Sequence, residues 1–143
     1  MNFLLISHGP MAKASLESAE MILGKQENVK TLEVTHDTTL EGMVSEIREA
    51  YHAFNQSELI IFCDILGGTP SNASLRFINE QSDVSVITGF NLPTLIEAFM
   101  SAQRTKTELL QIIKETYQNG MVEMTLSVTE ANTQDQLLEE IEL

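Results

Sequence analysis

The chain has 143 residues, of which 43% are hydrophobic and 20% charged, and its formal net charge is −13. This length and composition are typical of one globular domain with a single well-filled core, and the strong negative charge disfavours nucleic acid and anionic membranes as partners. No apolar run is long enough to cross a bilayer, no secretion signal is expected, and the single cysteine, Cys63, suits a reducing cytoplasm.

Apolar strands and amphipathic helices alternate along most of the chain. In chain order, the patterns predict strands over 3–6, 29–34, 59–63 and 84–87, with helices over 11–23, 40–54, 70–78, 93–102 and 106–118. A last strand is predicted over 121–128, followed by a polar, acidic tail over 129–143. We therefore expect a domain over 1–128 and a separate tail.

Two of the predicted strands end in polar residues that suit a functional site. The element order predicts an α/β fold with a doubly wound, mainly parallel sheet in the strand order 2-1-3-4, covered by helices. In this order the first and third strands are neighbours, and a crevice opens at their carboxyl ends. The residues at those ends are His8 and Asp64. We therefore expect these two side chains to meet.

A histidine beside an aspartate, without a neighbouring serine or cysteine nucleophile, favours the histidine as the nucleophile. Asp64 would accept a hydrogen bond from the Nδ1–H of His8 and leave Nε2 free to attack. The segment Gly67-Gly68-Thr69-Pro70 would bring backbone N–H groups and a hydroxyl to a helix start, a favourable place for an anion, and Gly9 would open access beside the histidine. Together these residues predict phosphoryl transfer onto His8. No metal-binding spacing and no nucleotide-binding loop accompany them, so no cofactor is expected.

Each residue also has an ordinary structural interpretation. His8 alone could be a loop residue, Asp64 could cap a turn or helix, and a glycine pair can simply form a turn. His36 and His52 are expected on the surface. The conjunction at one predicted crevice, rather than any single residue, favours the functional interpretation.

Three motifs in order resemble the mannose-family enzyme IIA component of the bacterial sugar phosphotransferase system. They are SHG at 7–9, DILGGTPSN at 64–72 and ITGFNLPTLIEAF at 87–99. The resemblance implies that His8 carries the phosphoryl group and that Asp64 orients the imidazole of His8. It also implies that the phosphoryl group is held by Gly67, Gly68 and Thr69. Asn91 and Pro93 match a segment beside the site in a structural role. Members often carry an aromatic residue where this chain has Ser71, which places one partner contact in question.

The resemblance also implies partners and an assembly. It implies a cytoplasmic homodimer that accepts phosphoryl groups from the phosphocarrier protein HPr and passes them to enzyme IIB, which serves the membrane permease IIC/IID. The last strand, 121–128, would be exchanged between subunits, and enzyme IIB would be a separate protein. Nothing in the chain identifies the transported sugar.

Four other functions are compatible with parts of this pattern. The first is the phosphocarrier subunit of a dihydroxyacetone kinase, whose relatives depart from GGTP at 67–70. A receiver domain would need an acidic pair after its first strand, and a flavin-binding module would need several hydroxyl residues there, but this chain has SHGPMA. A regulatory domain without catalysis stays open, although the chain retains both His8 and Asp64.

Overall fold

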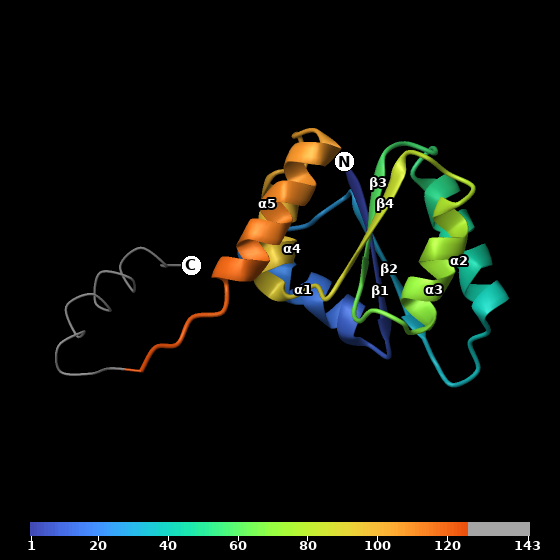
Figure 1. The fold of residues 1–143 in the computed structure, drawn as a ribbon, viewed down its shortest axis with the longest axis horizontal. Helices are drawn as coiled ribbons and strands as arrows, with labels where there is room; N and C mark the ends of the chain where they lie inside the picture. The colour runs from blue at the N-terminus through green and yellow to red at the C-terminus, as the bar shows by residue number, and fades with distance from the viewer. Residues whose placement is uncertain (126–143) are drawn as a thin grey trace.

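A computed structural model describes residues 1–125 as a four-stranded sheet with helices on both faces (Figure 1). The strands are β1 (Asn2–His8), β2 (Val29–Val34), β3 (Leu59–Cys63) and β4 (Val84–Thr88). The helices are α1 (Met11–Leu23), α2 (Leu40–Ala53), α3 (Thr69–Ile78), α4 (Leu92–Met100) and α5 (Lys106–Asn119). These bounds agree with the predicted elements to within two residues at nearly every end. His8 is the last residue of β1 instead of the second residue after it.

The sheet is parallel throughout and has the order β2-β1-β3-β4, which confirms the predicted fold. In Figure 1, α2 and α3 cover one face of the sheet, while α1, α4 and α5 cover the other. The connection after β1 therefore leaves toward one face, and the connection after β3 leaves toward the opposite face. This divergence opens the crevice between their carboxyl ends.

The two central strands are apolar without interruption because both of their faces are covered. In β1, Leu4 and Ile6 pack toward α2 and α3, whereas Phe3 and Leu5 pack toward α1, α4 and α5. All four side chains are fully buried. The same alternation holds in β3, so the sheet divides the core into two layers and fixes the register of the strand ends that carry the site.

The helices begin at residues that satisfy their free N–H groups. Thr39 accepts a hydrogen bond from the Gly42 N–H at the start of α2, and Asn91 forms a reciprocal capping box with Thr94 at the start of α4. The helical pattern of 11–23 predicts an inner face of α1 formed by Leu16, Ala19, Ile22 and Leu23. This prediction is wrong for Ile22, which is exposed. The buried face runs through positions 12, 16, 19 and 23, and a residue one position from 23 is turned about 100° away from that face.

The strand predicted at 121–128 is not formed in the part of it that the structure describes. Residues 121–125 follow α5 as an exposed segment without strand pairing, and 126–128 lie outside the described residues, as does the tail 129–143. The predicted domain boundary at 128 therefore stays a prediction. Within residues 1–125, no helix combines the length and apolarity that a membrane crossing requires.

We expect the buried thiol of Cys63 to make the protein less stable in alkali. Burial is the main cause that raises the pKa of Cys63 to about 11, against an ordinary 9.0; the nearby charge of Asp64 also raises it, and a hydrogen bond with Ser74 opposes the rise. At pH values between these two pKa values, the unfolded chain therefore binds fewer protons than the folded chain. The free energy of unfolding should fall by about 3 kcal/mol as the pH rises from about 9 to about 11.

Urea denaturation at a series of pH values measures this loss, with Cys63→Ala as the comparison. Burial and the neighbouring Asp83 also raise the pKa of Tyr51, so part of the alkaline loss should remain in the variant. A native thiol that reacts with a thiol reagent at pH 8 as fast as the denatured one would contradict the expectation.

Candidate active site

His8 and Asp64 meet at the carboxyl ends of β1 and β3, as predicted. The Nδ1 atom of His8 lies 2.7 Å from Oδ2 of Asp64, and the backbone N–H of His8 donates to the same oxygen at 2.8 Å. The second oxygen, Oδ1, accepts the Ile65 N–H at 2.8 Å. The imidazole side chain is 48% exposed, whereas the carboxylate side chain is only 9% exposed. The carboxylate is therefore fixed on three sides, while the outer part of the ring is open to an approaching partner.

This geometry assigns the tautomer of the neutral imidazole. An ionised carboxylate only accepts hydrogen bonds, so the ring proton of neutral His8 belongs on Nδ1. The lone pair on Nε2 is then available at the exposed edge of the ring.

Asp64 remains ionised because its hydrogen bonds outweigh the cost of its burial. Burial is the largest single influence on the pKa of Asp64 and raises it. The backbone and ring of His8, together with the Ile65 N–H, lower it further than burial raises it, so the pKa lies below its ordinary 3.8. A negative charge therefore stands behind the imidazole throughout the physiological pH range.

The loop after β1 is held by the buried serine that precedes the histidine. The hydroxyl of Ser7 donates to the carbonyl of Gly9 at 3.0 Å and accepts the Ala12 N–H at 2.7 Å. Gly9 has φ +60°, a backbone conformation that side chains rarely adopt, and its N–H donates to the carbonyl of Val34. The turn from β1 into α1 is thereby tied to the neighbouring strand and to the helix start.

The loop after β3 lies against the imidazole. A Cβ atom on Gly68 would lie 2.7 Å from Cε1 and 3.2 Å from Nε2 of His8, so only glycine allows this approach. Gly67 has φ +90° and turns the chain toward the start of α3, where Thr69 is the first helical residue. The N–H groups of Gly68 and Thr69 make no hydrogen bond within residues 1–125.

The side chain of Ser71 is turned into the protein, toward the two glycines that precede it. It is only 1% exposed, and its hydroxyl accepts the Gly67 N–H at 2.8 Å while donating to the Gly68 carbonyl at 3.1 Å. The motifs alone do not assign Ser7 or Ser71 to the site. Their proximity to the glycines in the sequence was the available signal, but their buried hydroxyls become evident only in three dimensions.

The other sequence candidates lie in structural or surface positions. Asn91 caps α4, and Pro93 is exposed near the start of that helix. His36 is exposed in the loop after β2, and exposed His52 contacts Gln56 near the end of α2. The described part of the chain contains no cluster of three or more histidine, cysteine or carboxylate residues that could hold a metal ion.

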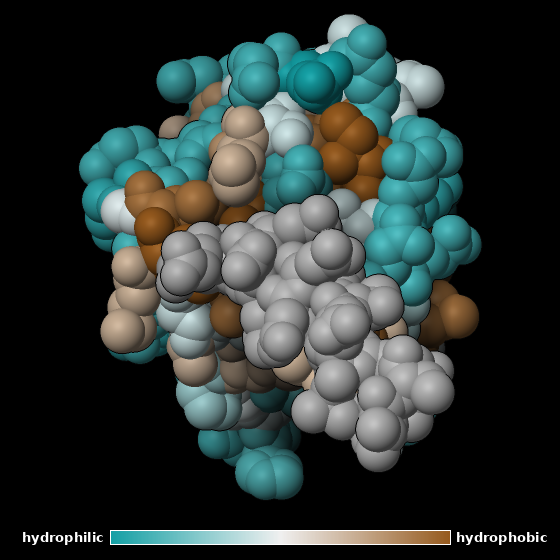
Figure 2. All heavy atoms as spheres, turned by 90° about the vertical axis from the view of Figure 1, so that its left-hand side faces the viewer, coloured by the Kyte–Doolittle hydropathy of each residue, from teal (hydrophilic) through white to brown (hydrophobic). Residues whose placement is uncertain are grey.

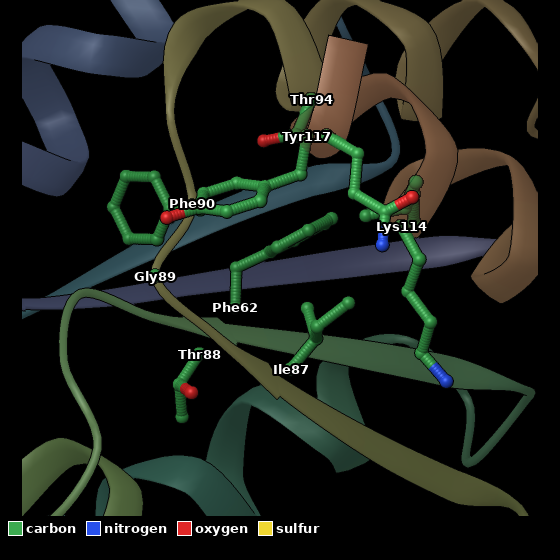
Figure 3. A pocket seen from close by; sticks show the side chains of 10 residues that line it. Phe62, Ile87, Thr88, Gly89, Phe90, Thr94, Lys114 and Tyr117 are labelled. Atoms are coloured by element: carbon green, nitrogen blue, oxygen red, sulfur yellow. The ribbon is translucent and has the colours of Figure 1, made fainter. Parts of the chain in front are cut away.

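A separate cavity of about 240 Å³ lies between β4 and α5 and does not include His8 or Asp64 in its lining. Figure 3 shows Phe62, Ile87 and Phe90 on its sheet side, with Lys114 and Tyr117 projecting from α5. Its lining is mainly apolar, unlike the polar surroundings of the imidazole. The cavity is therefore a different feature from the crevice at His8.

Comparisons with known proteins agree with the motifs at this crevice. The model of the EIIA-man family, described as PTS system fructose IIA component, matches residues 2–116. The chain is a member of the EIIA-man family. It is thus a phosphocarrier component of the sugar phosphotransferase type.

Individual relatives support the same family assignment for this EIIA-man protein. The sorbose-specific EIIA component of Lacticaseibacillus casei is 29% identical over 127 residues, which cover 86% of this chain and 92% of the relative. The mannose-specific EIIAB component of Escherichia coli K12 is 30% identical over 118 residues, covering 80% of this chain but 36% of that longer protein.

A solved structure extends the agreement to three dimensions. The mannose/sorbose specific IIA subunit from Enterococcus faecalis superposes on this EIIA-man protein with a TM-score of 0.82 at 25% identity. The superposition covers 88% of this chain and 96% of that one.

Proposed function

We propose that His8 of this EIIA-man protein accepts a phosphoryl group from phospho-HPr on Nε2 and passes it to an enzyme IIB partner in the cytoplasm. The observation that carries the proposal is the 2.7 Å contact between Nδ1 of His8 and buried Asp64, which leaves Nε2 as the free nucleophilic atom. The family assignment supplies the class of donor and acceptor. Such a protein acts as a transferase whose covalent intermediate is its own phosphohistidine.

Phosphoryl transfer to His8 requires no proton transfer. The Nε2 lone pair attacks the phosphorus atom, a new N–P bond forms on His8, and the N–P bond to the donor imidazole breaks with its electron pair returning to the donor nitrogen. Nδ1 keeps its proton and its hydrogen bond to Asp64. The positive charge that develops on the ring is balanced by the carboxylate behind it. The second transfer reverses these steps onto a nucleophile of enzyme IIB.

The loop at the imidazole supplies donors for the phosphoryl oxygens. The N–H groups of Gly68 and Thr69, which bond to nothing within residues 1–125, lie with the Thr69 hydroxyl at the start of α3, where the helix dipole favours an anion. The N–H of Gly67 already donates to Ser71, so Gly67 contributes through its backbone turn. Gly9 follows the histidine directly in the chain and adopts φ +60°, so the residue next to His8 carries no side chain.

Intact-mass spectrometry after incubation with phosphoenolpyruvate, enzyme I and HPr tests the proposal. We expect the gain of one acid-labile phosphoryl group, its attachment to Nε2 in nuclear magnetic resonance spectra, and its loss when an enzyme IIB is added. No gain in the presence of phosphorylated HPr would reject the proposal. Transfer to a dihydroxyacetone kinase subunit in place of enzyme IIB would support the kinase alternative.

We propose, in addition, that two copies of the chain form a homodimer in which the segment 121–128 of each lies on the other. β4 is an edge strand within the described chain, and the apolar cavity lies beside it. Figure 2 shows further hydrophobic patches on the face that carries α5. Met121, Val122 and Met124 are exposed apolar side chains that an edge strand could accommodate.

Light scattering after size-exclusion chromatography measures this assembly. We expect a particle with twice the mass of one chain, and a monomer when Val122 and Met124 are both replaced with aspartate, because charged side chains would oppose burial at the edge. A monomeric wild-type chain at micromolar concentration would contradict the dimer.

A further inference from the structure

The position of the loop at residues 64–68 determines how much space surrounds the nucleophilic nitrogen. Gly68 lies against the imidazole so closely that a Cβ atom there would be 3.2 Å from Nε2. A phosphoryl group on Nε2 must fit beside this glycine. Displacement of the loop by about 1 Å can change a transfer rate about 100-fold, because the reacting atoms require a narrow range of distances.

The glycine pair in this loop has little intrinsic rigidity. Gly67 adopts φ +90°, and glycine is the residue with the most conformational freedom. The flanking residues Ile65 and Leu66 are exposed and pack little against the core. The loop therefore needs an external anchor to hold Gly68 against the ring.

Ser71 provides that anchor from the first turn of α3. Its single hydroxyl bridges the two glycines, accepting the Gly67 N–H at 2.8 Å and donating to the Gly68 carbonyl at 3.1 Å. The side chain is 1% exposed, so water does not compete for these bonds. Ser7 makes the equivalent pair of bonds in the loop on the other side of His8, to Gly9 and Ala12. A buried serine thus holds each of the two loops.

We infer that Ser71 is a positioning residue for phosphoryl transfer. Its hydroxyl bonds to the loop and to no atom of the imidazole, and it acts by holding Gly67 and Gly68 so that Gly68 stays beside Nε2. Without the hydroxyl, the Gly67 N–H would turn toward water, since Gly67 is exposed. Gly68 would keep the hydrogen bond that its carbonyl accepts from the Asn72 N–H at 3.0 Å but would lose the bond from Ser71. The inference rests on the proposed function of His8.

Ser71→Ala tests the inference, and Ser74→Ala is the matched control. Ser74 lies one turn further along α3, is fully buried, and donates to the Pro70 carbonyl at 2.7 Å without touching the glycine loop. Both variants lose one buried hydroxyl from the same helix. We expect the single-turnover rate of His8 phosphorylation at saturating phospho-HPr to fall about 10-fold to 100-fold in Ser71→Ala, and to stay within about twofold in Ser74→Ala.

A small phosphoryl donor separates positioning from protein docking. Phosphoramidate transfers its phosphoryl group to an imidazole nitrogen and releases ammonia, so it needs no protein surface. The loss in Ser71→Ala should appear with phosphoramidate as well as with phospho-HPr, and hydrogen exchange at the Gly67 amide should become faster. A loss confined to phospho-HPr would overturn the inference, as would a wild-type rate with both donors. Failure of the wild-type protein to be phosphorylated at His8 would instead reject the proposed function.

Discussion

Replacing His8 with glutamine is expected to abolish phosphorylation while the protein remains folded. The glutamine amide can still donate a hydrogen bond to Asp64, but it offers no nucleophilic nitrogen, because its lone pair is delocalised. The side chain at this position is 48% exposed, so the free energy of unfolding should change by less than about 1 kcal/mol. Intact-mass spectrometry with phosphoenolpyruvate, enzyme I and HPr measures the loss.

The two remaining histidines provide matched controls for this variant. His36 and His52 are both exposed, and neither lies at the carboxyl end of a central strand. We expect His36→Gln and His52→Gln to accept one phosphoryl group at the wild-type rate. If His8→Gln were phosphorylated to the wild-type extent, the phosphoryl group would be carried elsewhere and the proposed site would be wrong.

Replacing Asp64 with asparagine is expected to slow transfer about 10²-fold to 10³-fold, because the developing charge on the imidazole loses its counterion. The carboxylate accepts N–H groups on both oxygens, from His8 on one and from Ile65 on the other. An asparagine must direct its NH₂ group toward one of these N–H donors, and that donor then has no acceptor. We therefore also expect a loss of about 1–3 kcal/mol in the free energy of unfolding.

Two measurements distinguish the charge effect from the folding effect. Rapid-mixing kinetics at saturating phospho-HPr gives the transfer rate, and urea denaturation gives the stability; Asp37→Asn, an exposed change in the loop after β2, should alter neither. Because the pKa of Asp64 is lowered on folding, its stabilisation is complete above its ordinary 3.8 and is lost as the pH falls below that value. This acid-dependent component should be absent from Asp64→Asn. A wild-type rate in Asp64→Asn would remove the orienting role from this carboxylate.

The agreement between sequence and structure is closest where burial and chain order leave few choices. Leu4 and Ile61 belong to strands that are apolar on both faces, and such strands occur in covered parallel sheets. The order of elements then placed the ends of β1 and β3 side by side, which brought His8 to Asp64. The prediction was wrong for Ile22, where a helical pattern with adjacent apolar residues does not show which one faces inward.

The fold class, the strand order and the histidine–aspartate pair follow from the amino-acid sequence alone, because hydrophobic periodicity and the handedness of parallel connections are local and general constraints. The expected contact between Nδ1 of His8 and Asp64 is present at 2.7 Å. The close approach of Gly68 to the ring and the groups that Ser7 and Ser71 bind became evident only in three dimensions. These contacts depend on differences of a few tenths of an ångström in the distances between loops from different parts of the chain. Spacing along a sequence carries no information at that scale, since the packing of the whole core sets where each loop comes to rest.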